Sequence, residues 1–260
     1  MAKIWINPIT IKLEGTLHLG AGYRRGLIDN AIARDGNGRV YVPGSSFKGK
    51  VREACEWIAS SQGLCICQAP NPNMMCGGSE SHCKHQPCII CRVFGGPGGH
   101  QQEILGLYWD NAYLPQLPDV EKTNRKRSLK KGQLKLSYPR TQVGMSRSRG
   151  VAYEGLLYTG EFTAEGLAFQ TCLSGYLELT PVLGEKGRYY ELILLVAGLR
   201  LVDSLGGNTS RGAGRCHINL PDYITVNSVD FGEEDLSIDW LLERLELLQL
   251  YKEEIEEVDG

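Results

Sequence analysis

A glycine-rich loop over residues 206–215 carries the residue types that bind phosphate. Glycines let a backbone adopt positive φ and approach another molecule closely, and successive amides in such a loop can form an anion-binding nest. The loop also offers a hydroxyl and two guanidinium groups but no acid, which favours a phosphate ligand. A mobile glycine-rich turn is the alternative. The candidate phosphate-binding residues are Gly206, Gly207, Ser210, Arg211, Gly212, Gly214 and Arg215.

The segments around this loop argue against a nucleotide-hydrolysing P-loop. An apolar run over residues 192–202 predicts a helix before the loop, and residues 216–220 alternate as a strand does. A P-loop follows a strand and opens a helix, so the order here is reversed.

Six of the nine cysteines fall between residues 65 and 91, together with two histidines. A cytosolic chain seldom stabilises a loop with disulfides, so a thiolate-bound metal is the better interpretation. The Cys88–Cys91 pair has the CxxC spacing that can hold one tetrahedral zinc, and four protein ligands leave no position for a catalytic water. Redox chemistry at this pair is the weaker alternative, because no thioredoxin-like βαβ pattern surrounds it. The favoured ligands are Cys76, Cys83, Cys88 and Cys91, with Cys65, Cys67, His82 and His85 as alternates.

A second anion site is predicted where a helix begins near residue 44. Ser45 and Ser46 have hydroxyl groups that can cap its first turn. Lys48 and Arg52 lie four residues apart and therefore share one helical face. The N-terminus of a helix attracts anions through its amides and its dipole. An ordinary surface helix would begin in the same way, so both interpretations stay open.

Residues 140–150 combine basic side chains with an apolar one. Arg140 and Arg147 are separated by small polar residues and by Met145. Basic groups beside an apolar wedge suit a hairpin that grips a nucleic-acid backbone and inserts between bases. A plain exposed hairpin is the alternative.

The net charge of −2 conceals a strong separation of charge along the chain. Residues 121–149 contain ten Lys or Arg and one acid, whereas residues 230–260 contain twelve acids and two bases. The basic stretch is a candidate nucleic-acid contact, and the acidic tail could meet a basic neighbour. Solvated segments are the alternative for both. Residues 122–135 hold few large apolar side chains, which predicts a mobile excursion.

Composition places the chain among soluble globular proteins. It has 260 residues, of which 42% are hydrophobic and 22% are charged. The first residues lack a signal-peptide core, and no apolar run reaches the ~18–20 residues that a membrane span needs. We therefore expect a cytoplasmic protein without a membrane partner.

Hydrophobic patterns predict the elements that position these candidate residues. Several strands and two main helices indicate an α+β sheet with helices on one face. After residue 220 we expect a polar link, and then an amphipathic helix that opens at residue 238. The predicted strands cover residues 9–14, 104–109, 156–162, 168–179 and 216–220, and the two main helices cover residues 47–58 and 191–202.

Several segments together resemble the RAMP superfamily, and more narrowly the backbone subunit of type III CRISPR effector complexes. The resemblance spans residues 8–220, and several motifs in the right order are more specific than any one of them. The matching segments are Leu17–Gly22, Ile28–Asn30, Val42–Arg52, Cys88–Gly95, Arg140–Val143, the spaced residues Leu156, Tyr158, Glu161, Gly166 and Phe169, and Gly206–Arg215.

The resemblance implies a modified RNA-recognition-motif (ferredoxin-like) core with an inserted zinc-binding loop and a thumb hairpin. It implies a RAMP domain over residues 1–220, whereas the acidic extension with an amphipathic helix over residues 221–260 departs from the family pattern. The zinc-binding loop then covers about residues 63–95, and the basic and thumb segment about residues 120–155.

The resemblance also implies a function. Copies of the subunit would stack along a guide CRISPR RNA, beside other type III subunits and neighbouring copies or paralogues, and their thumb hairpins would interrupt the guide–target duplex. Asp29 corresponds by position to an aspartate that cleaves the target RNA. A carboxylate can hold a divalent cation, Mg²⁺ or Mn²⁺, or orient a 2′-hydroxyl for attack on its own phosphate. The positions that align with guide contacts are His18, Ser45, Ser46, Lys48, Arg52 and the glycine-rich loop.

Two other functions stay open. In a scaffold subunit Asp29 would be inert, since an aspartate in a turn is usually only a turn residue. A guide-maturation endoribonuclease of the same superfamily would share the glycine-rich loop. Such an enzyme would not be expected to combine the Gly44–Arg52 helix start with a cysteine cluster.

Overall fold

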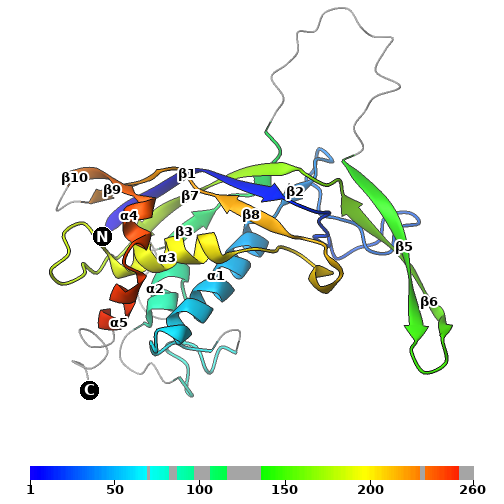
Figure 1. Cartoon of the computed structure of the whole chain (residues 1–260), viewed down its shortest axis with the longest axis horizontal. Helices are drawn as coiled ribbons and strands as arrows, with labels where there is room; N and C mark the ends of the chain where they lie inside the picture. Colours follow the sequence, from blue (N-terminus) through cyan, green and yellow to red (C-terminus); the bar gives the residue numbers. More distant parts are fainter. Residues whose placement is uncertain (69–70, 82–86, 97–105, 116–135, 229–231, 252–260) are drawn as a thin grey trace, which may run out of the picture.

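The computed structural model describes the whole chain except residues 69–70, 82–86, 97–105, 116–135, 229–231 and 252–260. It has a mixed α/β architecture built on one large antiparallel sheet (Figure 1), as the sequence predicts. The basic stretch at residues 122–135, for which the sequence predicts a mobile excursion, lies outside the described residues.

The sheet has eight strands in the order β10-β9-β1-β7-β4-β2, with β3 paired to β7 and β8 paired to β1. β1 at its centre alternates buried and exposed residues, so its isoleucine and leucine side chains are all buried on one side. The strands are β1 Ala2–Leu13, β2 Tyr41–Val42, β3 Gly106–Trp109, β4 Ala112–Tyr113, β7 Ala168–Leu177, β8 Cys216–Asn219, β9 Tyr223–Ser228 and β10 Gly232–Ser237.

The helices lie together on one side of this sheet (Figure 1). α3 (Tyr190–Leu201) is buried over ten of its twelve residues, which places it at the centre of the core. α1 (Gly44–Ser61) packs against α3 through an apolar face, and the short α2 (Ile89–Phe94) contacts both helices. Both main helices predicted from the sequence are confirmed within a few residues at each end.

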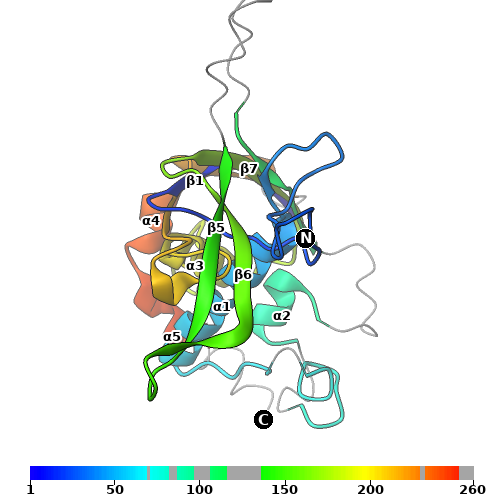
Figure 2. The same cartoon turned by 90° about the vertical axis from the view of Figure 1, so that its right-hand side faces the viewer.

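A long hairpin forms a separate two-stranded sheet that projects from one end of the main sheet (Figures 1 and 2). Its strands are β5 (Ser137–Ser146) and β6 (Val151–Thr163). The sequence predicts a hairpin at residues 140–150, and the observed one continues to Thr163. Its base therefore reaches the body of the protein.

The chain after residue 220 differs from the sequence prediction. The predicted polar link forms β9 and β10, and β9 pairs with the first residues of β1. The predicted amphipathic helix is broken into α4 (Ile238–Leu242), a 3-10 turn (Leu245–Leu247) and α5 (Leu248–Tyr251). Buried side chains in each piece pack against α3, so tertiary packing overrides the helical pattern here.

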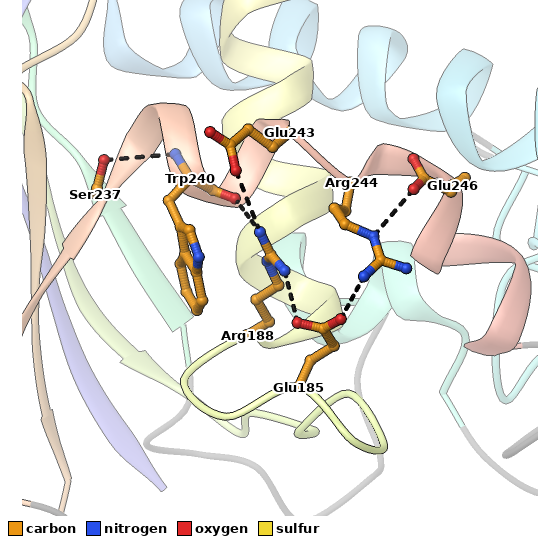
Figure 3. Close-up of polar contacts among 7 residues, drawn as sticks. All are labelled: Glu185, Arg188, Ser237, Trp240, Glu243, Arg244 and Glu246. Carbon is orange, nitrogen blue, oxygen red and sulfur yellow. Dashed lines mark hydrogen bonds and ion pairs between the residues drawn. The ribbon is translucent and has the colours of Figure 1, made fainter.

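An ion-pair network fastens this C-terminal segment to the loop before α3 (Figure 3). The buried guanidinium of Arg188 donates to Glu185 at 2.6 Å and to the carbonyl of Trp240 at 2.9 Å, and it lies 4.2 Å from the Trp240 ring centroid. Arg244 bridges Glu185 and Glu246 from the other side. Within the described residues, no helix is long and apolar enough to cross a bilayer.

Candidate functional site

A concave pocket of about 490 Å³ lies where the main sheet meets the base of the hairpin. Its wall is formed by residues of the segment that follows β1, from His18 to Ala31. The pocket brings His18 and Asp29, two of the predicted site residues, to one surface. The lining residues are His18, Gly20, Gly22, Tyr23, Arg24, Asp29, Asn30 and Ala31.

Backbone bonds to the base of the hairpin fix the position of Asp29. Its Oδ2 accepts a hydrogen bond from the amide of Thr159 on β6 at 2.8 Å, and its own amide donates to the Thr159 carbonyl at 2.9 Å. Its Oδ1 lies 3.6 Å from Nε of Arg24. The carboxylate is one-third exposed, so it is held in place and still open to the pocket.

His18 connects the pocket to the hairpin and to the glycine-rich loop. Its Nδ1 donates to the carbonyl of Glu161 at 2.7 Å, so Nε2 is an acceptor in the neutral ring. Its own carbonyl accepts from the amide of Gly207 at 2.9 Å. A side chain at Gly206, where φ is +75°, would clash with that same carbonyl. The first two glycines of the loop therefore allow a close approach to the protein's own backbone.

The rest of the glycine-rich loop limits the predicted anion-binding nest. The amide of Gly214 donates to Thr16, that of Gly212 to Thr209, and those of Arg211 and Ala213 to Asn208. These amides, with that of Gly207, already have partners in the protein. Internal hydrogen bonds thus hold the loop in shape, and a nest could use only other amides of the loop.

The two arginines of the loop lie at the surface, where neighbouring side chains orient them. Arg211 donates to Oε1 of Gln142 at 2.9 Å and to the hydroxyl of Tyr158 at 3.3 Å, which connects the loop to the hairpin. Arg215 pairs with Glu14 at 3.0 Å. Ser210 is exposed beside them on a single 3-10 turn, Thr209–Arg211. Both guanidinium groups therefore remain available to a larger anionic ligand.

A buried carboxylate that the sequence analysis assigns no role holds the pocket and the hairpin together. Glu161 is 3% exposed and accepts from Arg34 at 2.6 Å, from Ser137 at 2.7 Å and from the amide of Ile32 at 3.2 Å. Burial alone would raise its pKa, but the bonds from Ser137 and Arg34 outweigh burial and hold the pKa below its usual range. An acid inside an apolar strand pattern is the sequence signal that could have identified it.

The hairpin presents the predicted basic and apolar side chains to solvent. Arg140 stacks over the ring of Phe162 at 5.1 Å, and Arg147 and Met145 are exposed. Further apolar side chains are exposed along both of its strands. These are Val143, Val151, Tyr153, Leu156 and Leu157.

The start of α1 differs from the predicted capped anion site. Pro43 is the N-cap residue, and neither Ser45 nor Ser46 forms a capping hydrogen bond; both hydroxyl groups are exposed. Lys48 is half-buried, and its pKa is lowered by this burial and by the neighbouring charge of Arg52. Ser45, Ser46 and Lys48 therefore lie at the surface of the first turns, without the predicted cap.

Arg52 is used inside the protein, which argues against its predicted role as a phosphate contact. Its Nε donates to Glu56 at 2.8 Å and its Nη1 to the carbonyl of Gly95 at 3.3 Å. Its side chain is only 16% exposed. Thiolates at Cys67 and Cys91 would lie within electrostatic range of its guanidinium. Arg52 therefore supports the cysteine cluster from the neighbouring helix.

Four buried cysteines form a cluster that could hold a metal ion. The Sγ atoms of Cys67, Cys76, Cys88 and Cys91 all lie within 4.8 Å of one another, with Cys67 at 3.3 Å from Cys91 and 3.7 Å from Cys88. A tetrahedral zinc with Zn–S of about 2.3 Å needs sulfur atoms ~3.8 Å apart, so the spacing fits. Hydrogen bonding to Cys88, together with burial, raises the pKa of Cys67. Ionising these thiols together therefore needs a cation.

The cluster settles part of the ligand prediction. Cys76, Cys88 and Cys91 come together as expected, and Cys67, an alternate in the sequence analysis, is the fourth member among the described residues. Cys65 is exposed and outside the cluster. Cys83, His82 and His85 lie outside the described residues. The amide of Cys88 donates to Sγ of Cys76 at 3.2 Å, the kind of bond that orients a metal ligand.

Comparisons with known proteins agree with this geometry. The chain is 26% identical over 215 residues to the protein named CRISPR system Cms endoribonuclease Csm3 of Methanocaldococcus jannaschii. The aligned region covers 79% of this chain and 74% of that protein. Residues 10–217 match the RAMP superfamily, which confirms the family resemblance found in the sequence. Because this match covers most of the sequence, the chain belongs to the RAMP superfamily.

Proposed function

We propose that this protein is a guide-RNA-binding backbone subunit of a type III CRISPR effector complex and that Asp29 cleaves the paired target RNA. One observation carries the proposal. Asp29 is held by β6 at the root of the projecting hairpin, in the same pocket as His18 and next to the glycine-rich loop. The likeness to a protein named as a CRISPR endoribonuclease supports the same conclusion.

Guide binding rests on side chains around this pocket. Arg211 and Arg215 present guanidinium groups for phosphates, and Lys48, Ser45 and Ser46 add donors at the start of α1. His18 offers Nε2 to a nucleotide in the pocket. These groups contact the RNA backbone, so binding should depend on salt and only weakly on sequence.

Target cleavage rests on the carboxylate of Asp29. It accepts the proton of a 2′-hydroxyl, whose oxygen attacks the adjacent phosphorus while the bond to the 5′-oxygen breaks and that oxygen takes a proton from solvent. The products are a 2′,3′-cyclic phosphate and a 5′-hydroxyl. A divalent cation, Mg²⁺ or Mn²⁺, would supply charge neutralisation at the phosphate. Within the described residues, no group of three or more metal-binding side chains includes Asp29, so RNA oxygens or water would supply the other ligands of such a cation.

An RNA-binding scaffold without cleavage is the second candidate. The observation that favours it is the pairing of Asp29: one oxygen is bound to an amide and the other lies near the guanidinium of Arg24. Both contacts occupy carboxylate oxygens that a 2′-hydroxyl or a cation would otherwise use. Target cutting by the assembled complex separates this candidate from the first.

The cysteine cluster holds a structural zinc in this proposal. Its four thiols are buried and leave no open coordination position; two come from the start of α2 and two from the loop before it. A loop with little regular structure of its own thereby gains an organising centre.

The RNA that accompanies the purified protein tests the proposal directly. A backbone subunit expressed with its guide should retain RNA of uniform length, or of a ladder with a constant step, because each copy covers a fixed number of nucleotides. Extraction and end-labelling of that RNA measures it. RNA of random length that a high-salt wash removes would contradict the proposed role.

A further inference from the structure

Arg24 lines the pocket, and neither the sequence analysis nor the proposed function assigns it a role in the reaction. It shares the cavity with His18 and Asp29. Among the pocket-lining residues named above, Arg24 alone carries a permanent positive charge, since an arginine stays protonated in proteins. A cation in this position can meet the phosphate that the carboxylate of Asp29 must approach.

The backbone of a short turn places Arg24 opposite Asp29. The amide of Arg25 donates to the carbonyl of Ile28 at 2.9 Å, and the amide of Ile28 donates back to the Arg25 carbonyl at 3.1 Å. Gly26, with φ of +60°, allows the chain to reverse between them. The pairing of Arg25 with Ile28 is antiparallel, so the next pair outward is Arg24 with Asp29, and cross-strand neighbours of this kind face each other. Backbone bonds therefore direct Arg24 toward the carboxylate.

The contact between Arg24 and Asp29 is too loose to serve mainly as a structural ion pair. Nε of Arg24 lies 3.6 Å from Oδ1 of Asp29, and the arginine side chain is 80% exposed. Exposed pairs of this kind contribute little to stability, because water screens them and a long side chain loses rotamer freedom. The structural pair of this region is the buried one between Arg34 and Glu161, at 2.6 Å. Arg24 can therefore leave Asp29 for another anion at little cost to the fold.

The guanidinium of Arg24 retains donors for a phosphate. Its contact with Asp29 runs through Nε, and within the part of the chain that the structure describes, no other group bonds to this side chain. The N–H groups of both terminal nitrogens are thus available, and two of them match the spacing of two phosphate oxygens. A phosphate bound by this fork lies beside the carboxylate of Asp29, separated from it by the width of one guanidinium.

From this arrangement we infer that Arg24 is a second catalytic residue, which binds the scissile phosphate of the target RNA. The inference rests on the proposed function, because it needs an RNA whose 2′-hydroxyl reaches Asp29. As the phosphate enters, the guanidinium turns from Oδ1 of Asp29 to two non-bridging oxygens. Oδ1 then becomes available to the 2′-hydroxyl, while Oδ2 keeps its bond from the amide of Thr159. The substrate itself thereby removes the contact that occupies the carboxylate in the RNA-free protein.

The charge that develops during cleavage explains why a guanidinium serves this step. When the 2′-oxygen attacks, phosphorus becomes five-coordinate and its non-bridging oxygens gain negative charge. Donors held beside these oxygens bind the transition state more strongly than the ground state, which lowers the barrier. Arg24 transfers no proton, because its guanidinium stays protonated. The proton of the 2′-hydroxyl still goes to Asp29, and the 5′-oxygen still takes one from solvent.

The rate of target cutting by the assembled complex tests this role in three variants. Arg24→Ala should slow cutting by ~10²–10³-fold, the loss expected for one oxyanion donor, while guide and target binding stay close to normal. Arg24→Lys should recover part of the rate, since an ammonium supplies the charge without the planar fork. Arg25→Ala is the matched control and should cut at the same rate as the unsubstituted complex, because Arg25 is exposed and is not among the residues that line the pocket.

Rescue by free guanidinium separates a phosphate contact from a structural role. Guanidinium chloride, below the concentration that unfolds the protein, should raise the cutting rate of the Arg24→Ala complex, because the cation can enter the space left beside the phosphate. Sodium chloride at the same ionic strength should not raise it, since it only screens charge. The Arg25→Ala complex should not gain from guanidinium.

Several results would overturn the inference while leaving the proposed function intact, because the unsubstituted complex still cuts in each of them. Unchanged cutting by Arg24→Ala would exclude a catalytic role, and faster cutting would show that Arg24 inhibits Asp29. An equal loss in Arg25→Ala would assign the effect to net charge. A loss that comes with a lower melting temperature and no rescue would assign Arg24 a structural role. Absence of cutting by the unsubstituted complex would instead contradict the proposed function, and this inference with it.

Discussion

At the scale of single residues, the pocket depends on side chains that orient one another. Glu161 accepts from Arg34, Ser137 and the amide of Ile32, while its carbonyl accepts from His18 and its amide donates to Asn30. One residue thus fixes the ring of His18 and the loop next to Asp29. The buried carboxylate is balanced by Arg34, so replacing Glu161 would leave the guanidinium of Arg34 without its carboxylate partner.

The depressed pKa of Glu161 predicts how stability depends on pH. Its folded pKa lies below the unfolded value of 4.5, so the unfolded chain binds more protons between the two values. The stabilisation is complete above pH ~4.5 and is lost as pH falls through the folded pKa. Glu161→Gln should lower stability at pH 7 and flatten the decline between about pH 5 and pH 3. Urea unfolding at several pH values measures this, and an unchanged acid slope would contradict it.

Two arginines that looked equivalent in the sequence should behave differently. Arg211 is exposed and bonded only to the neutral side chains of Gln142 and Tyr158, whereas Arg52 is paired with the carboxylate of Glu56 beside the cysteine cluster. Arg211→Ala should weaken the binding of RNA of every sequence by the same factor and reduce the slope of log affinity against log salt by ~1. Arg52→Ala should instead lower the melting temperature, through loss of hydrogen bonds each worth ~1.5–3 kcal/mol. A smaller salt slope in Arg52→Ala with unchanged stability would refute this division.

At the scale of elements, the cysteine cluster links the positions of three helices. Cys88 and Cys91 begin α2, which packs against both α1 and α3. Arg92, the next residue, pairs at 3.0 Å with the fully buried Glu191 in the first turn of α3. Burial raises the pKa of Glu191, and the charge of Arg92 opposes that rise. Metal binding is thereby connected to the central helix of the core.

Substitution of single cysteines tests the ligand set. Cys67→Ser should remove the metal, reduce solubility and lower the melting temperature, because a hydroxyl is a poor zinc ligand. Cys65→Ser is the control and should retain about one zinc per chain, because Cys65 is exposed and outside the cluster. Metal analysis by mass spectrometry, with thermal unfolding before and after chelation, provides the measurement. Full zinc content in Cys67→Ser, or its loss in Cys65→Ser, would show that a different ligand completes the site.

At the scale of the whole molecule, the local patterns were predictable and the long-range partners were not. The apolar periods locate β1, α1 and α3, and the CxxC spacing locates the metal cluster. The sequence signal failed where partners are distant: β9 and β10 are polar strands that exist because β1 leaves an edge to pair with. Likewise, Ser45 and Ser46 look like caps, but Pro43 fills that position. The sequence makes Arg52 a candidate phosphate contact, but in the folded protein its guanidinium is bound to Glu56 on the same helix and to the distant carbonyl of Gly95.

The C-terminal segment should behave as part of the folded domain. Arg188 is buried against Trp240 and donates hydrogen bonds to Glu185 and to the Trp240 carbonyl, so replacing it removes the bonds that join the C-terminal segment to the loop before α3 (Figure 3). Arg188→Met should lower stability by ~1.5–3 kcal/mol and increase proteolytic cleavage between residues 238 and 251. Arg200→Met is the control, since its pair with Asp239 is exposed and long at 3.8 Å. Equal stability of the two variants would show that the network does not hold the segment.

The most direct test of the central claim is cleavage of labelled, guide-complementary RNA by the assembled complex with Mg²⁺ or Mn²⁺, comparing Asp29→Ala with Asp35→Ala. Asp35 is the matched control, because its carboxylate serves its own turn through bonds to Asn37 and Arg39. We predict that Asp29→Ala slows cutting at this subunit's sites by at least ~10²–10⁴-fold while guide and target binding stay close to normal. The complex with Asp35→Ala should cut at the same rate as the unsubstituted complex. Undiminished cutting by the Asp29 variant, or no cutting by the unsubstituted complex, would contradict the assignment of Asp29 as the cleaving residue.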